Sequence, residues 1–342
     1  MQRMVSSACN SWFGGNGMAT IKDVAERVGV SVTTVSRVLN NRGYLSEDLK
    51  RRVHEAMKEL NYQPNELARS LFRKKSNIIG LIIPDISHPL FGEFARHVEE
   101  YAYKNRYKIL LCNSQLENRK ELDYISMLKA SQVDGIIMGS HTLDTEEFTT
   151  INLPLVTLDR QLSESIPYVS ADHYKGGVLA TRLLVRKGCR KIAHISGNLK
   201  LHLLAKSRYD GFMDTVTKAG ISHVVVETDL NGFKYDEYEK IVEELFREHP
   251  DIDGVFASSD VIAAQVLKEC RRLGKEVPKD VKVVGFDGIK LGGYITPGLS
   301  TIQQPIKEIA KTSVQLLMDQ INGKEVQREN ILPVKLLEKE TT

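Results

Sequence analysis

The 342-residue chain predicts a small all-α helix-turn-helix head followed by an α/β body of two doubly wound parallel-sheet lobes. Two short amphipathic helices joined by a Gly turn stand near the N-terminus. Beyond residue 76, apolar strands alternate with amphipathic helices in two successive series. Because these remaining ~265 residues exceed what one hydrophobic core usually organises, two lobes are expected.

The head begins with a predicted helix over residues 20–28, in which Thr20 is the N-cap and Gly29 ends the helix. A second helix starts at its N-cap Ser31, and a third starts at Ser46. Apolar side chains at helical spacing close a small three-helix core. They are Ile21, Val24, Ala25, Val28, Val35, Val38, Leu39, Leu49, Val53, Met57 and Leu60.

The second helix suits the major groove of duplex DNA. Core packing leaves Val32, Thr33, Ser36 and Arg37 outside, where methyls, hydroxyls and one Arg can reach thymine methyls and guanine acceptors. An ordinary helical hairpin has the same periodicity and caps, so charge must decide. Residues 18–76 hold 12 Lys and Arg against 7 Asp and Glu, whereas residues 77–342 hold 34 against 37. A basic excess confined to the head favours phosphate binding.

The body alternates strands and helices. The first series has strands at 78–83, 107–111 and 134–138 with helices near 89–105 and 118–130, followed by strands at 155–158 and 168–171. The second has strands at 191–195, 223–226, 254–257 and 281–285 with helices near 205–219, 235–248 and 260–273. A helix near 305–322 and a strand near 331–337 end the chain. Continuous apolar strands are typical of parallel sheets covered on both faces.

Charged residues follow several of these strands, at the ends where doubly wound sheets bind ligands. Carboxylates around one Arg suit a polyhydroxylated ligand, because carboxylates accept from sugar hydroxyls and Arg donates a two-pronged bond. Each residue also has a structural explanation as a helix cap, a turn residue or a surface ion pair. The candidates after strands are Asp159, Arg160, Asp172, Asp260 and Asp287, and Arg208 stands at the start of the helix near 205–219.

Four motifs, at residues 18–25, 30–40, 61–65 and 67–71, together resemble the lactose/galactose repressor family of bacterial transcription factors. The resemblance continues through residues 77–339. Within that family the chain resembles the sucrose-operon repressors of Gram-positive bacteria. Four further segments carry this finer likeness, at 111–115, 132–135, 158–160 and 303–306.

The resemblance implies how the head would contact DNA. Val32, Thr33 and Arg37 match positions that touch base edges in the major groove, and Leu71 matches a side chain wedged into the minor groove. The wider DNA-contacting set comprises Thr20, Thr34, Ser36, Asn40, Tyr62, Asn65, Ala68 and Arg69.

Residues 63–76 are expected to be a hinge helix and linker after a DNA-binding domain at 18–62. Pro64 suits the first helical position, yet an isolated helix below ~12 residues is marginal in water. Two copies meeting over DNA would order it, and an inserted Leu71 would kink the duplex. A plain amphipathic linker helix is the alternative.

The resemblance also implies a periplasmic-binding-protein-like body at 77–340 that binds its effector between lobes. We expect the N-lobe at about 77–173 and 304–330 and the C-lobe at about 174–303 and 331–340, so that the chain crosses between lobes three times. Arg208 and Asp287 match the family's effector cleft most closely, followed by Asp159, Asp172 and Asp260.

Two segments depart from the family pattern. In the loop at 84–91, Phe91 is expected to stack on the ligand, whereas His88 stands where Asn is more usual and is expected at a helix start or in solvent. Residues 199–205 are apolar where many sugar-binding relatives are polar. This second departure leaves the identity of the effector open.

The sequence shows no catalytic constellation, so an enzyme is not expected, nor a metal site or a cofactor. The four Cys are scattered and the nine His lack ligand spacing. A secreted sugar-binding protein would need a signal peptide, but residues 1–17 lack an apolar core and are expected to be a disordered leader. The sequence contains no run of ~20 apolar residues, so a membrane partner is not expected. Unpaired-looking cysteines favour the cytoplasm.

We therefore expect a cytoplasmic homodimeric repressor of a carbohydrate-use operon of the sucrose or fructose type. It would bind a palindromic operator and answer allosterically to a sugar or sugar phosphate. A catabolite regulator answering to a phosphorylated carrier protein is the alternative. The exact effector, the sign of its action, the operator and the regulated genes stay open.

The minor-groove wedge can be tested directly. Replacing Leu71 with Ala should weaken specific operator binding and leave ligand binding alone, because only the kinked complex uses this side chain. Operator titrations and ligand titrations of the two proteins measure both effects. Unchanged operator affinity would reject the wedge.

Overall fold

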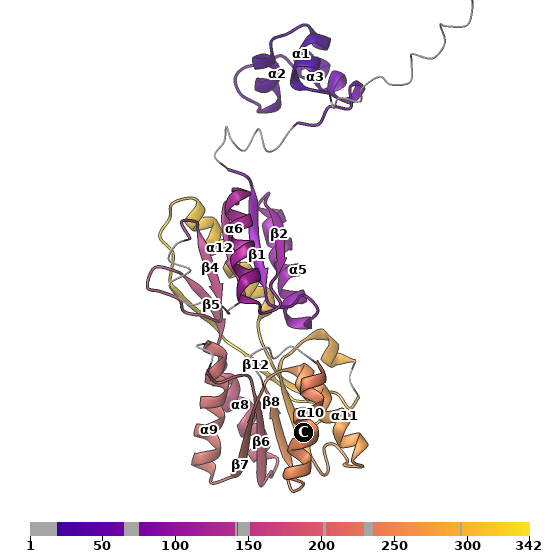
Figure 1. Ribbon diagram of the computed structural model, residues 1–342, viewed down its shortest axis with the longest axis vertical. Coiled ribbons are helices and arrows are strands. Elements are labelled where there is room, and N and C mark those ends of the chain that lie inside the picture. The colour runs from indigo at the N-terminus through magenta and orange to yellow at the C-terminus, as the bar shows by residue number, and fades with distance from the viewer. Residues whose placement is uncertain are drawn as a thin grey trace, which may run out of the picture. The chain divides into compact units, whose positions relative to one another are not determined.

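The computed structural model describes residues 19–64, 75–140, 142, 151–200, 203–228, 235–294 and 296–342 (Figure 1). The chain divides into one compact unit ending at Ser76 and another over Asn77–Thr342. The expectations for the leader 1–17 and for Asn65, Ala68, Arg69 and Leu71 lie outside the described residues. No helix in these ranges is both long and apolar enough to cross a lipid bilayer.

The head contains the three predicted helices, α1 (Ile21–Val28), α2 (Val32–Leu39) and α3 (Glu47–Glu59). The Thr20 side chain accepts from the Asp23 backbone N–H, and Asp23 accepts from the Thr20 N–H, so the two residues form a capping box. Gly29 ends α1 in the left-handed conformation at φ 73°, which glycine adopts without steric cost. The fully buried Val24, Val35 and Val53 join the three helices in one core.

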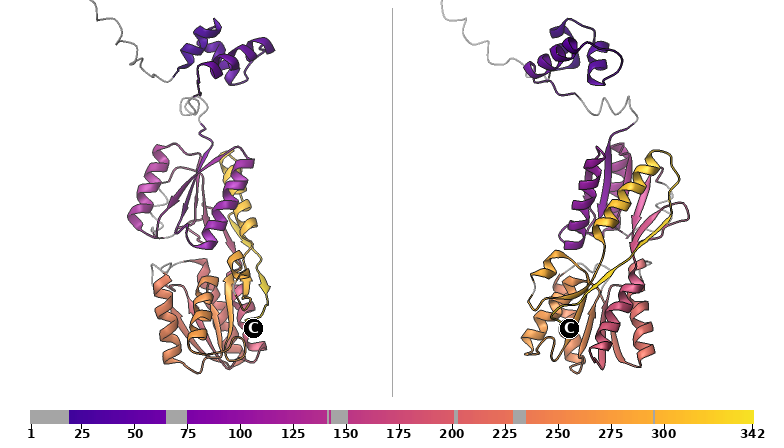
Figure 2. Two further views of the ribbon diagram at one scale, coloured as in Figure 1. Left: turned by 90° about the vertical axis from the view of Figure 1, so that its right-hand side faces the viewer. Right: turned by 180° about the vertical axis from the view of Figure 1, so that it is seen from behind.

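The N-lobe is built on a six-stranded sheet in the order β11-β5-β4-β3-β1-β2, in which all neighbours pair in parallel. Helices α5 and α12 share a hydrophobic core on one face, and α6 packs on the other (Figure 2). The strands are β1 (Ile78–Ile83), β2 (Lys108–Asn113), β3 (Gly135–Met138), β4 (Leu155–Leu158), β5 (Tyr168–Ala171) and β11 (Glu329–Leu332). The helices are α5 (Pro89–Lys104), α6 (Asn118–Ala130) and α12 (Ile306–Ile321).

The C-lobe sheet has the order β12-β10-β9-β8-β6-β7, and only β12 is antiparallel to its neighbour. The strands are β6 (Lys191–Ser196), β7 (Ser222–Glu227), β8 (Gly254–Ala257), β9 (Lys282–Asp287), β10 (Ser300–Gln303) and β12 (Lys335–Leu337). The helices are α8 (His173–Arg186), α9 (Ser207–Ala219), α10 (Tyr235–Glu248) and α11 (Asp260–Arg272), with 3₁₀ turns at Leu204–Lys206 and Lys290–Gly293. Two separate cores cover the two faces of this sheet.

Three elements differ from the sequence-based expectation, and one of them is strand β10, which was not expected. The single strand expected near 331–337 is two strands, β11 and β12, one in each sheet. Pro333 lies between them, and proline cannot donate to a strand ladder. Helix α8 was not expected, because the pair Gly176–Gly177 weakens its helical pattern.

The chain passes between the two sheets at three places, from β5 to α8, from β10 to α12 and from β11 to β12. The first and third crossings lie side by side, since the Asp172 N–H donates to the Leu332 carbonyl at 2.8 Å. At the second crossing, the Gln304 N–H donates to the carbonyl of Asp287 at 3.0 Å. These short connections are where the two lobes can move as a hinge.

Helices α8 and α9 pack against each other through glycine. A Cβ atom at Gly177 would overlap the Arg208 carbonyl oxygen, and one at Gly211 would overlap the Tyr174 carbonyl oxygen. Each contact is with backbone, so no side-chain rotation could relieve it. The absence of these two Cβ atoms therefore lets the first turns of α8 and α9 lie close together.

Replacing Gly211 with Ala should destabilise the protein by about 1–3 kcal/mol, because the added methyl forces the two helices apart. Urea denaturation measures the change. Gly293→Ala is the matched control, since its Cβ would meet nothing within 4 Å, and it should be nearly neutral. Equal stability of the two variants would contradict the close-packing argument.

Candidate functional site

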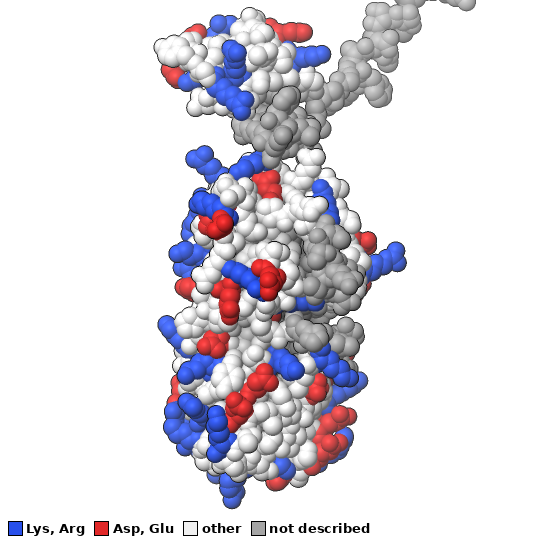
Figure 3. All heavy atoms as spheres, turned by 90° about the vertical axis from the view of Figure 1, so that its left-hand side faces the viewer, with Lys and Arg blue, Asp and Glu red and all other residues white. Residues whose placement is uncertain are grey.

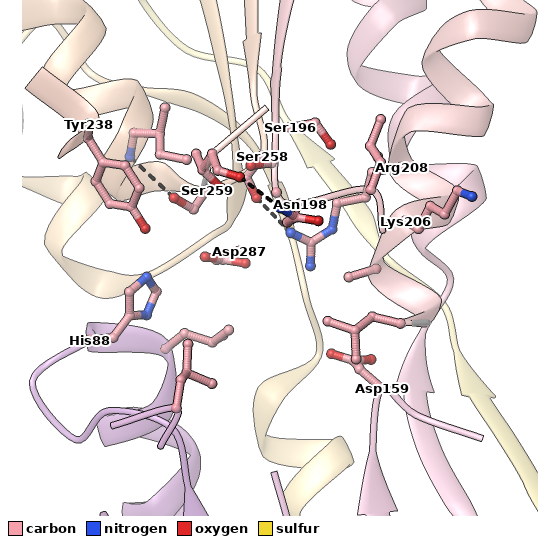
Figure 4. A pocket seen from close by; sticks show the side chains of 18 of the residues that line it. His88, Asp159, Ser196, Asn198, Lys206, Arg208, Tyr238, Ser258, Ser259 and Asp287 are labelled. Atoms are coloured by element: carbon pink, nitrogen blue, oxygen red, sulfur yellow. Dashed lines mark hydrogen bonds between the residues drawn. The ribbon is translucent and has the colours of Figure 1, made fainter. Parts of the chain in front are cut away.

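A cleft between the two lobes lies at the carboxyl ends of both sets of parallel strands (Figure 4). The N-lobe contributes the loop after β1 and the end of β4, and the C-lobe contributes the ends of β6, β8 and β9 and the start of α9. Four of the predicted effector residues line this cleft, namely Phe91, Asp159, Arg208 and Asp287. Charged and apolar groups thus face one cleft from both lobes.

Three other predicted residues are not among the described residues that line the cleft. Asp172 is the N-cap of α8, where its Oδ1 accepts from the Lys175 N–H at 2.9 Å. Asp260 is buried in the first turn of α11 and accepts from the Ile289 N–H at 2.8 Å and from the hydroxyl of Thr301. Arg160 is half-buried beside Asp159, and its carbonyl accepts from the Thr157 hydroxyl. Direct roles for these three residues remain predictions.

Arg208 is held from three sides. Its Nε donates to His173 Nδ1 at 3.1 Å, and one Nη donates to the Ser258 carbonyl at 2.6 Å. Its guanidinium carbon lies 3.8 Å from the centre of the Phe286 ring. Burial lowers the Arg208 pKa, and nearby carboxylates oppose that change. Arg208 is nevertheless charged, because a guanidinium is not deprotonated in proteins. These hydrogen bonds use two of its five N–H groups, so the guanidinium has further donors for a ligand.

Asp159 lies directly after β4 in a left-handed conformation at φ 53°. Its Oδ1 accepts from the Ser170 hydroxyl at 2.7 Å and is 2.8 Å from His173 Nε2. Burial opposes its charge, but His173, Ser170 and Arg208 together hold its pKa at about 2. Asp159 is therefore ionised at neutral pH and works as a hydrogen-bond acceptor.

Asp287 ends β9 with a positive φ of 105°, which is uncommon for a residue with a Cβ. It is only 1% exposed, and its Oδ1 accepts from the Gln304 side chain at 2.8 Å. Burial raises its pKa although Arg208 opposes the shift. Burial and the neighbouring Asp287 also raise the pKa of Asp260. Because the two carboxyls resist ionising together, this corner of the cleft can retain a proton near neutral pH.

Sequence reasoning missed the uncharged polar groups of the cleft. Ser196 and Ser258 lie at the carboxyl ends of strands, as the predicted carboxylates do. Serine residues alone, however, do not distinguish a ligand site in the sequence. His88 is the N-cap of α5, as expected of a helix start. The alternative expectation that it lies in solvent is wrong, since it is 3% exposed and lines the cleft. His173 had no sequence signal, because the helix that it begins was not expected.

The predicted DNA-contacting residues of the head lie mainly on one helix. Val32, Thr33 and Arg37 are exposed on α2, while the buried Val35 and Val38 face the core. Thr20 is exposed, and the half-buried residues of the predicted set are Thr34, Ser36, Asn40 and Tyr62. Lys and Arg side chains also project from the head surface (Figure 3). An exposed helix face with methyl, hydroxyl and guanidinium groups fits the chemistry of the major groove.

Two family models match different parts of the chain. Residues 20–65 match the bacterial regulatory proteins of the lacI family, and residues 181–342 match the periplasmic binding protein-like domain. Over 326 residues the chain is 45% identical to the ribose operon repressor of Halalkalibacterium halodurans, covering 95% of this chain and 97% of the relative. It is 40% identical over 324 residues to the sucrose operon repressor of Streptococcus mutans, covering 95% and 99%.

Solved structures show the same architecture. The lac repressor dimer bound to operator and the anti-inducer ONPF aligns with a TM-score of 0.86 at 26% identity, covering 95% of this chain and 99% of that one. A regulator from Alkaliphilus metalliredigens complexed with D-xylulofuranose aligns at 0.73 with 34% identity, covering 78% and 99%. The predicted two-part fold is thereby confirmed. The chain belongs to the LacI family of bacterial transcriptional regulators, with a helix-turn-helix head and a periplasmic-binding-protein-like body.

Proposed function

We propose that this protein represses a carbohydrate-utilisation operon in the cytoplasm and that a neutral sugar in the cleft controls its affinity for a palindromic operator. The observation that carries the proposal is the placement of Arg208 and Asp287 in one cleft between two hinged lobes. A sugar that contacts both lobes would favour one hinge angle over another. The exposed face of α2 supplies the DNA-reading chemistry in each copy of a homodimer.

The charge of the cleft favours a neutral sugar over a sugar phosphate. The positive charge of Arg208 is balanced by the ionised Asp159, to which His173 connects it. Lys206 also lines the cleft but is exposed, and its ammonium points away from Asp287 (Figure 4). A phosphate carries up to two negative charges and calls for an excess of cations. Hydroxyl groups can instead use Arg208 as donor and Asp159 as acceptor.

Among neutral sugars we propose one that presents a five-membered ring. The sequence resemblance points to sucrose or fructose, and sucrose contains a fructofuranose unit. The solved relative at 34% identity holds D-xylulofuranose, which is also a furanose. The relative at 45% identity is named for a ribose operon, so ribose is the second candidate. The apolar Leu199, Leu203 and Ile262 in the cleft can pack on the carbon face of such a ring.

Footprinting and titration on the DNA upstream of its own gene test the function. A panel of sucrose, D-fructose, D-xylulose, D-ribose and the corresponding phosphates should include a neutral sugar that changes operator affinity about 5- to 150-fold, the usual range for allosteric coupling. The titration also shows whether the sugar weakens or tightens operator binding, because either induction or corepression is compatible with the mechanism. A response only to a phosphorylated carrier protein would instead support the catabolite-regulator alternative.

Replacing Arg208 with Ala should leave operator binding intact and remove the response to the effector. The substitution removes the unused donors in the cleft together with the hydrogen bonds to His173 and Ser258. All of these lie in the unit without the head, so the DNA-reading helix keeps its contacts. Operator titrations with and without sugar measure both quantities. Arg190→Ala is the control, since that side chain is 93% exposed and should change neither. A normally induced Arg208→Ala protein would exclude the residue from effector recognition.

The raised pKa of Asp287 predicts a pH dependence of stability. Above the ordinary value of 3.8, the unfolded chain releases this proton before the folded protein does, so the stability contributed at this site falls as pH rises toward the folded pKa. Asp287→Asn lacks the titration but retains a carbonyl acceptor for Gln304. Its free energy of unfolding, relative to that of the unaltered protein, should therefore increase between acidic and neutral pH in urea titrations. Parallel pH profiles would contradict this assignment.

A further inference from the structure

The first crossing between the lobes places one buried histidine against both sides of the hinge. His173 is the first residue of α8 and follows β5 by two positions. It is 2% exposed and is not among the described residues that line the cleft. Its ring nevertheless contacts Asp159 at the end of β4 in the N-lobe and Arg208 on α9 in the C-lobe. A cleft residue of each lobe is thus bonded to the same imidazole.

The hydrogen bonds define the protonation state of this ring. Arg208 Nε can only donate, so His173 Nδ1 must accept. The ring proton is then on Nε2, from which it is donated to Asp159 Oδ1 at 2.8 Å. Burial lowers the His173 pKa, with Arg208 acting in the same direction and Asp159 and Asp172 opposing it, which agrees with a neutral ring. Arg208 therefore donates to His173, and His173 donates to Asp159. One ring proton, on Nε2, satisfies both hydrogen bonds.

The surroundings leave few ways for Arg208 to respond to a ligand without moving His173. The Arg208 backbone is fixed on α8 by its contact with Gly177, so a response must come from the side chain. The same guanidinium stacks on Phe286. On the other side, the Asp159 carbonyl accepts from the Leu204 N–H at 3.0 Å, in the turn that precedes α9. Asp159 thus connects the N-lobe to the C-lobe through both its side chain and its backbone.

We propose that His173 is a positioning residue that couples occupancy of Arg208 to the placement of the N-lobe through Asp159. The proposal rests on the proposed function, because it assumes that a sugar engages Arg208. A ligand that draws the guanidinium into the cleft weakens or reorients the Nε bond to His173. The ring then changes its hold on Asp159, and the angle between the lobes changes with it. His173 itself touches no ligand in this mechanism.

Two substitutions separate the two halves of the connection. His173→Asn places an amide near the position of Nδ1 and can retain an acceptor for Arg208, whereas His173→Gln reaches the position of Nε2 and can retain a donor for Asp159. Each variant preserves only one of the two contacts, so the connection between Arg208 and Asp159 is broken in both. Because His173 itself touches no ligand, both variants should bind operator and sugar with nearly unchanged affinity. The sugar-induced change in operator affinity should fall from about 5- to 150-fold to less than about twofold. His223→Asn, at an exposed histidine on β7, is the matched control and should respond normally.

The measurements are sugar affinity by calorimetry and operator affinity with and without saturating sugar, using the tightest-binding neutral sugar of the panel. Parallel ¹⁵N spectra of the imidazoles in the unaltered protein should show His173 protonated on Nε2 without sugar and shifted when sugar binds. A full response in both His173→Asn and His173→Gln would overturn the coupling role, as would His173 signals unmoved by sugar. An unaltered protein that binds no sugar of the panel would refute the proposed function itself, and the coupling proposal with it. Loss of sugar binding in both variants would also overturn the proposal, because it would assign His173 to the binding site.

Discussion

A guanidinium held between the lobes imposes the strongest constraint on the body. Arg208 is charged and half-buried, so polar contacts must offset the energetic cost of removing part of its guanidinium from water. The Ser258 carbonyl, the His173 ring and the face of Phe286 meet this demand from three elements. Each of those groups is therefore restricted in position, and Asp159 is restricted in turn through His173.

Close packing of α8 and α9 makes this arrangement geometrically feasible. Gly177 and Gly211 let the backbone of one helix meet the carbonyls of the other, which brings the first residue of α8 near Arg208. The second crossing works in a similar way, since Gln304 holds Asp287 through both its side chain and its backbone. Arg208 and Asp287, which both face the cleft from the C-lobe, are thus bonded to hinge residues. Ligand recognition and lobe geometry share the same hydrogen bonds.

The sequence predicted most elements because local rules and burial agreed in them. Thr20 and Ser46 mark helix starts with cap residues, and β1 and β8 are continuous apolar runs. Arg208 was identified at the start of a predicted helix, and charged residues after strands identified Asp159 and Asp287. The same pattern also selected Asp172 and Asp260, because a cap and a ligand group look alike until the direction of the side chain is known. His173 could not be found this way, since its role comes from contacts 14 and 35 residues distant in sequence.

The division of the last strand by Pro333 has a consequence for biosynthesis. Strand β11 completes the N-lobe sheet by pairing with β5, and β12 covers the edge of the C-lobe sheet at β10. A ribosome must therefore translate nearly the whole chain before the N-lobe acquires its final strand. Until then β5 presents an unpaired edge, a feature that favours association with other chains. Each sheet therefore lacks one of its edge strands until residues 329–332 and 335–337 have been synthesised.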